Sequence, residues 1–227
     1  MGFKIAIDGP AGAGKSYLAS QLALSLGILN VNTGAIYRAY ALYMLDNDVD
    51  INDENKVKEK LNEVEINQIV GEDGNSITFL NGQNVTDKLK QEIISKSSAV
   101  VSKYPSVREI VSLIQRNLAS KNDVVMEGRD IGSIILPDAD VKIFLTASDE
   151  IRAMRRYKEL IEKNMPADYD SILEGIRQRD IQDTTRKISP LVKAEDAVEV
   201  YTDNMTREEV VRFVLELINI KRKEIKN

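Results

Sequence analysis

The sequence predicts an α/β fold in which a five-stranded parallel sheet is flanked by helices. Five short apolar runs alternate with stretches whose apolar residues recur at helical spacing, and 227 residues suit one domain. The predicted buried strands are residues 3–8, 28–33, 123–127, 141–146 and 198–202. The predicted helices are residues 15–26, 35–45, 106–120, 150–163, 169–186 and 206–221. Because strands and helices alternate, we expect the sheet to be parallel and covered on both faces.

Residues 62–87 depart from this alternation. Two runs with alternating apolar residues, 64–70 and 76–82, flank an Asp-Gly-Asn turn, which is typical of a β-hairpin. Residues 83–86 extend the pattern by a third short strand. We therefore predict a small antiparallel sheet inserted outside the parallel core.

The composition excludes several kinds of chemistry. The chain has no cysteine and no histidine, so it has no disulfide, thiolate nucleophile, Ser-His-Asp triad or ordinary zinc site. With 31 Lys and Arg against 36 Asp and Glu, it lacks a protein-wide cationic field for nucleic acid or anionic membranes. It shows no signal peptide, membrane span, coiled-coil heptad or leftover apolar stripe. We therefore expect a soluble, cytoplasmic monomer that binds neither nucleic acid nor membrane.

The strongest motif follows the first predicted strand and precedes the first predicted helix, and it matches G-x-x-x-x-G-K-[ST]. Its residues are Gly9, Pro10, Ala11, Gly12, Ala13, Gly14, Lys15 and Ser16, with Tyr17 next. In such a P-loop the backbone N–H groups surround phosphate oxygens, the lysine reaches the β- and γ-phosphates, and the serine binds Mg²⁺. The alternative is a glycine-rich turn with an exposed lysine and no role in phosphate binding. The strand–loop–helix context favours a P-loop NTPase core that binds ATP, with Ser16 as a metal ligand.

A triphosphate site does not by itself identify a reaction. A GTPase would carry Asn-Lys-x-Asp after a later strand, whereas residues 144–148 read Phe-Leu-Thr-Ala-Ser. An oligomeric ATPase would end a strand in adjacent carboxylates, whereas residues 127–130 read Glu-Gly-Arg-Asp. Both alternatives are weakened.

A second anion site is predicted beside the loop. Thr33 is placed to cap the helix that follows it, and Arg38 lies one turn further on. Arg129 and Asp130 follow the middle strand, at the sheet edge where open α/β sheets bind ligands. The alternatives are a capped helix with a solvated arginine, and a structural Arg-Asp ion pair.

Arginines are concentrated in one segment of this acidic chain. Six of thirteen lie between residues 150 and 190. Arg179, Asp183 and Arg186 share one predicted helix face. Another face carries Arg152, Arg155 and Arg156. Charged helix faces are often merely solvated, but guanidinium groups also bind phosphates and stabilise charge during phosphoryl transfer.

Taken together, these residues resemble the cytidylate kinase family over essentially the whole chain. The matching segments are residues 5–16, 33–38, 105–108, 128–132 and 179–183, with Arg186 and residues 190–191 behind them. The resemblance implies one domain, 1–227, with a core of about 1–33, 105–150 and 187–227. It also implies an NMP-binding region of about 34–104, which includes the β insertion, and a helical lid of about 151–186. The implied reaction is Mg²⁺-dependent transfer of the ATP γ-phosphate to CMP or dCMP, in pyrimidine nucleotide metabolism.

The resemblance also implies roles for individual residues. Thr33, Arg38, Arg129 and Arg186 would hold the acceptor phosphate. The cytosine would be read by Arg108 and Asp130, and the sugar region contacted by Arg179 and Asp183. Lys15, Arg129, Arg155 and Arg186 would act in catalysis.

Three positions depart from the family pattern: Asn32 replaces an aspartate, Ala99 replaces a serine that assists base recognition, and Tyr17 replaces a threonine. Ser98 and Ser102 are candidate substitutes for the missing serine. Two other functions stay open. One is a related kinase acting on AMP, UMP or a non-nucleotide alcohol, and the other is a nucleotide-dependent switch, which would need no second arginine-lined site.

Overall fold

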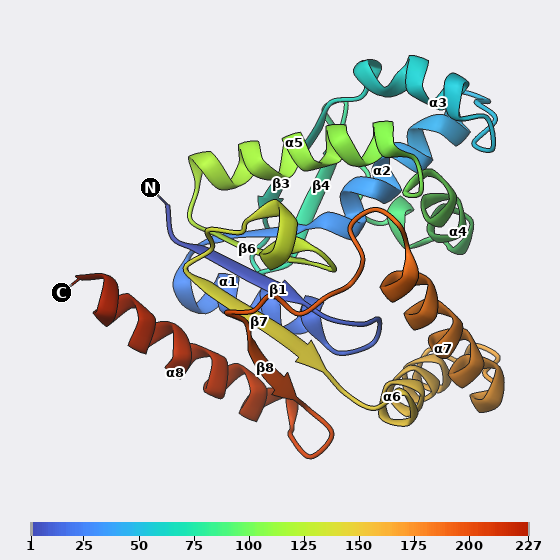
Figure 1. Ribbon diagram of the computed structural model, residues 1–227. Coiled ribbons are helices and arrows are strands. Elements are labelled where there is room, and N and C mark those ends of the chain that lie inside the picture. Colours follow the sequence, from blue (N-terminus) through green and yellow to red (C-terminus); the bar gives the residue numbers. More distant parts are fainter. Residues whose placement is uncertain (1, 227) are drawn as a thin grey trace. The chain divides into compact units, whose positions relative to one another are not determined.

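The computed structural model, which describes residues 2–226, confirms the predicted fold class (Figure 1). The large sheet has the strand order β2-β6-β1-β7-β8. Its strands are β1 (Lys4–Asp8), β2 (Leu29–Asn32), β6 (Val124–Gly128), β7 (Val141–Thr146) and β8 (Val198–Tyr201). β1 pairs in parallel with β7, and β7 with β8. Helices flank this sheet, as the alternation of strands and helices predicts.

The chain divides into two compact units, which are described separately. The loop unit comprises Lys4–Leu22 and the chain from Glu127 onward. The insertion unit comprises residues 23–126 together with the N-terminal end. Helix α1 (Lys15–Leu26) begins in the loop unit and ends in the insertion unit.

The loop unit is built on three neighbouring strands. β1 and β7 are almost wholly buried, as expected for apolar strands inside a parallel sheet. β8 forms the edge, and three of its four residues are exposed. The prediction of a fifth buried strand is wrong here, because an edge strand leaves one side without a neighbour. Helix α8 (Arg207–Lys226) runs alongside β7 and β8 and buries Val210, Val214 and Ile218.

Two further helices of the loop unit form a pair after β7. These are α6 (Asp149–Glu162) and α7 (Tyr169–Thr185), which pack against each other (Figure 1). A short π-helix, η3 (Ile131–Ile135), follows β6 and was not predicted. Among residues 2–226, no helix combines the length and apolarity needed to cross a membrane.

The insertion unit contains the predicted antiparallel sheet. Its strands are β3 (Ile66–Val70), β4 (Ser76–Leu80) and β5 (Gln83–Asn84), so the hairpin prediction is confirmed. Gly74 occupies the turn with φ of 75°, a conformation that glycine adopts readily. One face of the sheet is buried through Ile66, Gln68, Thr78 and Leu80.

Helices complete the insertion unit. They are α2 (Thr33–Asp46), α3 (Glu54–Lys60), α4 (Glu92–Val101) and α5 (Pro105–Lys121), with 3₁₀ turns η1 (Leu61–Glu63) and η2 (Lys88–Lys90). α2 packs against α4, α5 and β4 through a stripe that includes Ile36, Tyr40 and Met44. The sequence missed α3 and α4. α3 is one short amphipathic stretch that buries only Val57, and the serines of α4 weaken its apolar period.

Candidate active site

The loop between β1 and α1 has a backbone that requires glycine. Gly9 has φ of 145°, and a Cβ placed there would lie 1.9 Å from the carbonyl oxygen of Leu145. Gly12 has φ of 76°, and its Cβ would lie 3.3 Å from the Cβ of Arg152. The missing side chains therefore allow the loop to lie directly against the end of β7 and against α6. Consecutive N–H groups at the start of α1 are available to an anion in this arrangement.

Lys15 is held inside this loop. Its side chain is buried, and its Nζ donates a hydrogen bond to the carbonyl oxygen of Pro10 at 2.6 Å. Burial, and next the neighbouring Arg129 guanidinium, lower the pKa of Lys15 well below its usual range. Glu127 and Asp8 oppose that shift. A cation kept among other cations in this way is stabilised when an anion binds beside it.

Asp8 forms the junction between the loop and η3. Its two carboxylate oxygens accept the N–H groups of Ile131 at 2.8 Å and of Gly132 at 2.7 Å. Burial raises the pKa of Asp8 to about 6, although these two hydrogen bonds act in the opposite direction. The nearby Asp130 carboxylate raises it further. Asp8 thus fixes the turn that carries Arg129 and Asp130.

Arg129 lies between the loop and α7. Its Nε donates to Asp183 Oδ2 at 2.7 Å, so the alternative of an Arg129–Asp130 ion pair is not what the structure shows. Partial desolvation, and next Arg129 itself, lower the pKa of Arg179. Arg186 follows the end of α7, 3.7 Å from Asp183, and its Nε donates to the Ser189 carbonyl oxygen. The positive charge of Arg129 therefore acts both on Lys15 of the loop and on Arg179 of α7.

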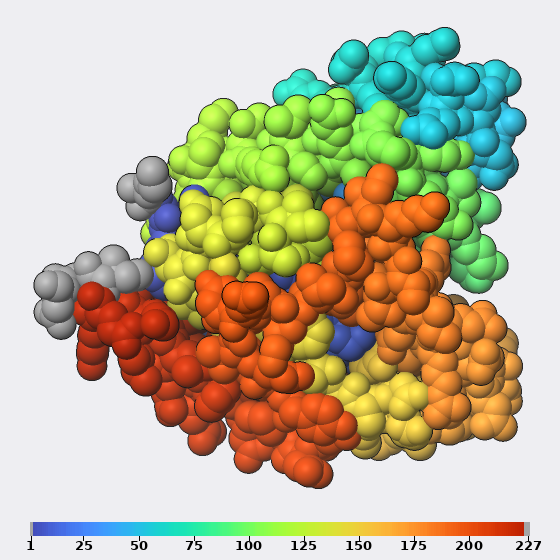
Figure 2. Space-filling model, viewed as in Figure 1, coloured from blue at the N-terminus to red at the C-terminus, as the bar shows by residue number. Residues whose placement is uncertain are grey.

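A cavity of about 300 Å³ opens beside the loop within the same unit. Its walls combine the loop, α6 and the segment after β8. They include Gly12, Ala13, Gly14, Lys15, Ser16, Tyr17, Arg152, Arg155, Arg156, Thr202, Met205, Arg207 and Val210. In Figure 2, blue atoms of the N-terminal segment are visible between the gold and orange atoms of the segment that follows β7.

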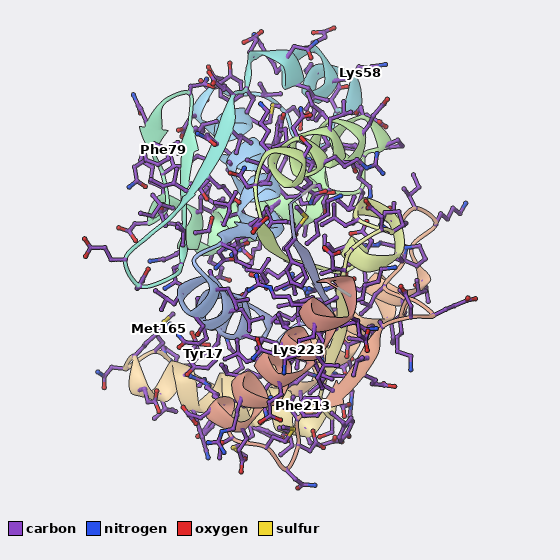
Figure 3. All side chains as sticks on the ribbon, turned by 90° about the vertical axis from the view of Figure 1, so that its left-hand side faces the viewer. Tyr17, Lys58, Phe79, Met165, Phe213 and Lys223 are labelled. Carbon is purple, nitrogen blue, oxygen red and sulfur yellow. The ribbon has the colours of Figure 1, made fainter. Side chains whose placement is uncertain are left out.

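Two contacts join residues that line this cavity. Tyr17, labelled on α1 in Figure 3, carries the Arg207 guanidinium over its ring at 5.3 Å from the ring centroid. Arg155 donates to Thr202 through Nη1 to the hydroxyl at 3.1 Å and through Nη2 to the carbonyl oxygen at 2.9 Å. The cavity is thus lined by the phosphate-binding loop with Tyr17, by arginines of α6 and α8, and by Thr202, Met205 and Val210.

The insertion unit carries a second set of predicted residues at the start of α2. The N-cap is Asn32, whose side-chain oxygen accepts the Ala35 N–H at 2.9 Å, so the prediction that Thr33 is the cap is wrong. Asn32 is extended, while Thr33 is the first helical residue. Buried Gln68 of β3 holds the Asn32 backbone by donating to its carbonyl oxygen and accepting its N–H. Arg38 Nε donates to the Gly34 carbonyl oxygen at 3.0 Å, which keeps the guanidinium beside the helix N-terminus.

Arg108 is a buried arginine on α5 of the insertion unit. Its guanidinium lies 5.8 Å from the centroid of the Tyr37 ring, and its Nη1 donates to the Ser102 carbonyl oxygen at 3.3 Å. The hydroxyls of Ser98 and Ser102 donate to carbonyl oxygens of their own helical turns. Arg108 therefore lies against the Tyr37 ring, and Ser98 and Ser102 stay candidate substitutes for the serine missing at Ala99.

The structure brings the predicted site residues together in two sets. The loop unit holds Gly9 to Tyr17 with Arg129, Asp130, Arg155, Arg179, Asp183 and Arg186, and the insertion unit holds Thr33, Arg38 and Arg108. Sequence reasoning missed Asp8, Glu127 and Thr202 as site residues. Asp8 and Glu127 end or nearly end parallel strands, and Thr202 directly follows one, which is the signal that identified Arg129.

The donor set bears on which metal could bind. Among residues 2–226, no group of three or more His, Cys, Asp or Glu side chains could hold a metal ion. Ser16, exposed at the first turn of α1, offers one hydroxyl oxygen beside the phosphate-binding N–H groups. Mg²⁺ is commonly bound by one or two protein oxygens, substrate phosphates and water. The residues present therefore fit an Mg²⁺ ion that arrives with a nucleotide.

Comparison with known proteins gives consistent matches. A family model described as cytidylate kinase matches residues 5–220. A cytidylate kinase from Caldicellulosiruptor saccharolyticus is 47% identical over 213 residues, covering 94% of this chain and 94% of the relative. Those from Carboxydothermus hydrogenoformans and Bacillus subtilis are 45% and 43% identical, covering 96% of this chain and 98% and 96% of the relatives. A solved structure of an uncharacterized protein from Eubacterium ventriosum has a TM-score of 0.51 at 11% identity, covering 96% of this chain and 98% of its own, and supports the fold alone.

Proposed function

The chain belongs to the cytidylate kinase family, and from that premise we propose that it transfers the γ-phosphate of ATP to CMP or dCMP, with Mg²⁺, giving ADP and CDP or dCDP. The observation that carries the proposal is the cluster of Lys15, Arg129 and Arg179 in the loop unit. After burial, the Arg129 guanidinium is the largest cause that lowers the pKa of Lys15 and of Arg179, and the Glu127, Asp8 and Asp183 carboxylates do not reverse the lowering at Lys15. Such a cluster favours a polyanion, which two phosphorylated substrates supply.

We propose that ATP occupies the cavity beside the loop. The loop N–H groups would surround its phosphates, and Tyr17, Thr202 and Met205 would line the space for the nucleoside. Lys15 would exchange the Pro10 carbonyl oxygen for a phosphate oxygen, since both lie within reach of one ammonium group. The bound Mg²⁺ would neutralise phosphate charge, with Ser16 as its protein ligand.

The acceptor is proposed to be its own nucleophile. A CMP phosphate oxygen already carries negative charge, so transfer needs positioning and charge neutralisation rather than a strong base. Arg129 and Arg186 would hold that phosphate in the loop unit, and Asp183 keeps Arg129 oriented through its hydrogen bond to Nε. Arg155 would act on the transferred phosphate only after releasing Thr202.

The remaining acceptor contacts are proposed from family resemblance. Arg38, beside the N-terminus of α2, would bind the CMP phosphate together with Thr33. Arg108 would donate to the cytosine edge, with Asp130 accepting from its amino group. Asp183 and Arg179 would contact the sugar.

ADP formation from ATP tests the proposal. We would measure it at fixed Mg²⁺ with CMP, dCMP, UMP, AMP, GMP, shikimate as a non-nucleotide alcohol, or no acceptor. We expect CMP and dCMP to give the highest kcat/KM and turnover without acceptor to be near background. A preference for another acceptor would overturn the substrate assignment, and equal turnover without acceptor would indicate an ATPase.

A further inference from the structure

One guanidinium joins three segments of the loop unit. Arg152 on α6 donates from Nε to the Ala147 carbonyl oxygen at 3.0 Å and from Nη1 to the Ala11 carbonyl oxygen, also at 3.0 Å. The same Nη1 donates to Asp180 Oδ1 at 3.1 Å, and Nη2 donates to Asp180 Oδ2. The Arg152 side chain is only 5% exposed. The phosphate-binding loop, the end of β7 and helix α7 thus share one buried cation.

The Arg152 contacts depend on the Arg152–Asp180 ion pair and on the close approach of Gly12 to the Arg152 side chain. The two-pronged Arg152–Asp180 pair is the strong form of a charge-assisted hydrogen bond, and burial makes the loss of either partner costly. Gly12 leaves room for it, because a Cβ there would press against the Arg152 side chain. A lysine at residue 152 could not supply the same fork of donors.

Helix α7 carries more than this contact. Asp183 lies one turn beyond Asp180 and accepts from Arg129, while Arg179 is adjacent to Asp180. The helix is therefore held to the phosphate-binding loop by one turn and to the end of β6 by the next. The Ala11 carbonyl oxygen is thus connected through Arg152 and Asp180 to the helix that carries Arg179 and Asp183.

We infer that Arg152 and Asp180 are positioning residues that couple the two substrate sites, so that ATP in the loop tightens the binding of CMP. This inference rests on the proposed function. ATP fixes the loop and the Ala11 carbonyl, Arg152 transmits that position to Asp180, and α7 then presents its acceptor-binding side chains. By linkage, CMP tightens ATP binding by the same factor.

The chain offers a matched control for this coupling. Arg177 also ties α7 to α6, through Asp149 and through Glu150 at 3.0 Å. Its side chain is 47% exposed, and its partners Asp149 and Glu150 stand at the start of α6. Arg177→Ala therefore removes an α6–α7 ion pair without removing the contact to the loop.

Calorimetric titration of CMP, with and without a non-hydrolysable ATP analogue and Mg²⁺, tests the inference. We expect the analogue to tighten CMP binding by about fivefold or more in the wild type, and to the same extent in Arg177→Ala. In Asp180→Asn we expect the ratio of the two dissociation constants to fall close to one, with affinity for the analogue alone changed by less than about threefold. Circular dichroism checks the fold, and if Asp180→Asn does not fold, Arg152→Lys takes its place.

Several outcomes would overturn the inference: a wild-type ratio of one, an undiminished ratio in Asp180→Asn, or an equal loss in Arg177→Ala. Wild-type protein that binds the ATP analogue but binds no CMP would instead refute the proposed function. The two failures are therefore distinguishable in the same titrations.

Discussion

Replacement of Asp8 by asparagine should change how stability depends on pH. Asp8 is 5% exposed and accepts two backbone N–H groups of η3. Burial raises its pKa from 3.8 to about 6 in the folded protein. The substitution keeps the shape and one acceptor oxygen but removes the titration.

The magnitude follows from the two pKa values. A tenfold difference in proton affinity is worth about 1.4 kcal/mol. The rise in the Asp8 pKa from 3.8 in the unfolded chain to about 6 in the folded protein therefore corresponds to about 3 kcal/mol. Between these values the folded protein keeps the Asp8 proton while the unfolded chain has released it, so the free energy of unfolding falls as the pH rises. The contribution is favourable below about pH 3.8 and is lost by the time the pH passes through about 6.

Urea unfolding from pH 3.5 to 7.5 measures this contribution as the difference between wild type and Asp8→Asn. We expect the wild type to lose about 3 kcal/mol relative to the variant across the range, mostly between pH 4 and 6. Asp138→Asn is the control, because Asp138 is exposed and its hydrogen bond from Lys4 lowers its pKa. The reasoning would be refuted if the free energy of unfolding had the same pH dependence in wild type and Asp8→Asn. It would also be refuted if NMR of the carboxyl carbon gave Asp8 a pKa near 4.

Three further predictions concern the site itself. Lys15→Ala should lower kcat by about 10² to 10³-fold with an unchanged circular dichroism spectrum, because under the proposed function it removes a donor to the transferred phosphate; near-normal turnover would contradict that role. Gly9→Ala should lower the free energy of unfolding by at least about 2 kcal/mol in urea, since its Cβ would strike the Leu145 carbonyl oxygen. Gly27→Ala, also at positive φ but facing open space, should cost less. Arg186→Ala should raise KM for CMP about tenfold or more while KM for ATP changes less than twofold, whereas Arg177→Ala should leave both constants unchanged; steady-state kinetics with each substrate varied decide this.

Much of the fold could be predicted because local patterns and global packing agree. The apolar runs of β1, β6 and β7 are buried strands, and the Asp-Gly-Asn turn closes the predicted hairpin. The predictions failed where the burial or conformation of a segment depends on residues distant in the sequence. β8 resembles the other strands in sequence but lies at the edge of the sheet, and two N–H groups of η3 donate to the Asp8 carboxylate, 123 and 124 residues away in the chain.

The helix start at Asn32 shows a finer limit. Both Asn32 and Thr33 are good caps by residue type. Gln68, 36 residues away on the hairpin, holds the Asn32 backbone in an extended conformation, so Asn32 becomes the cap and Thr33 the first helical residue. Two positions are thus equivalent by residue type, and the cap is the one whose backbone is hydrogen-bonded to a residue distant in the sequence.

The sequence by itself determined the α/β architecture and the phosphate-binding loop, and it supplied most of the charged candidates for the site, because strand periodicity, glycine geometry and motif spacing are local properties. Only the tertiary structure decided which charges meet. Arg129 pairs with Asp183 rather than with adjacent Asp130, Arg152 spans from the loop to Asp180, and buried Asp8 acquires a raised pKa. These outcomes depend on distances between groups tens to more than a hundred residues apart and on their removal from water, and neither quantity can be read from residue order.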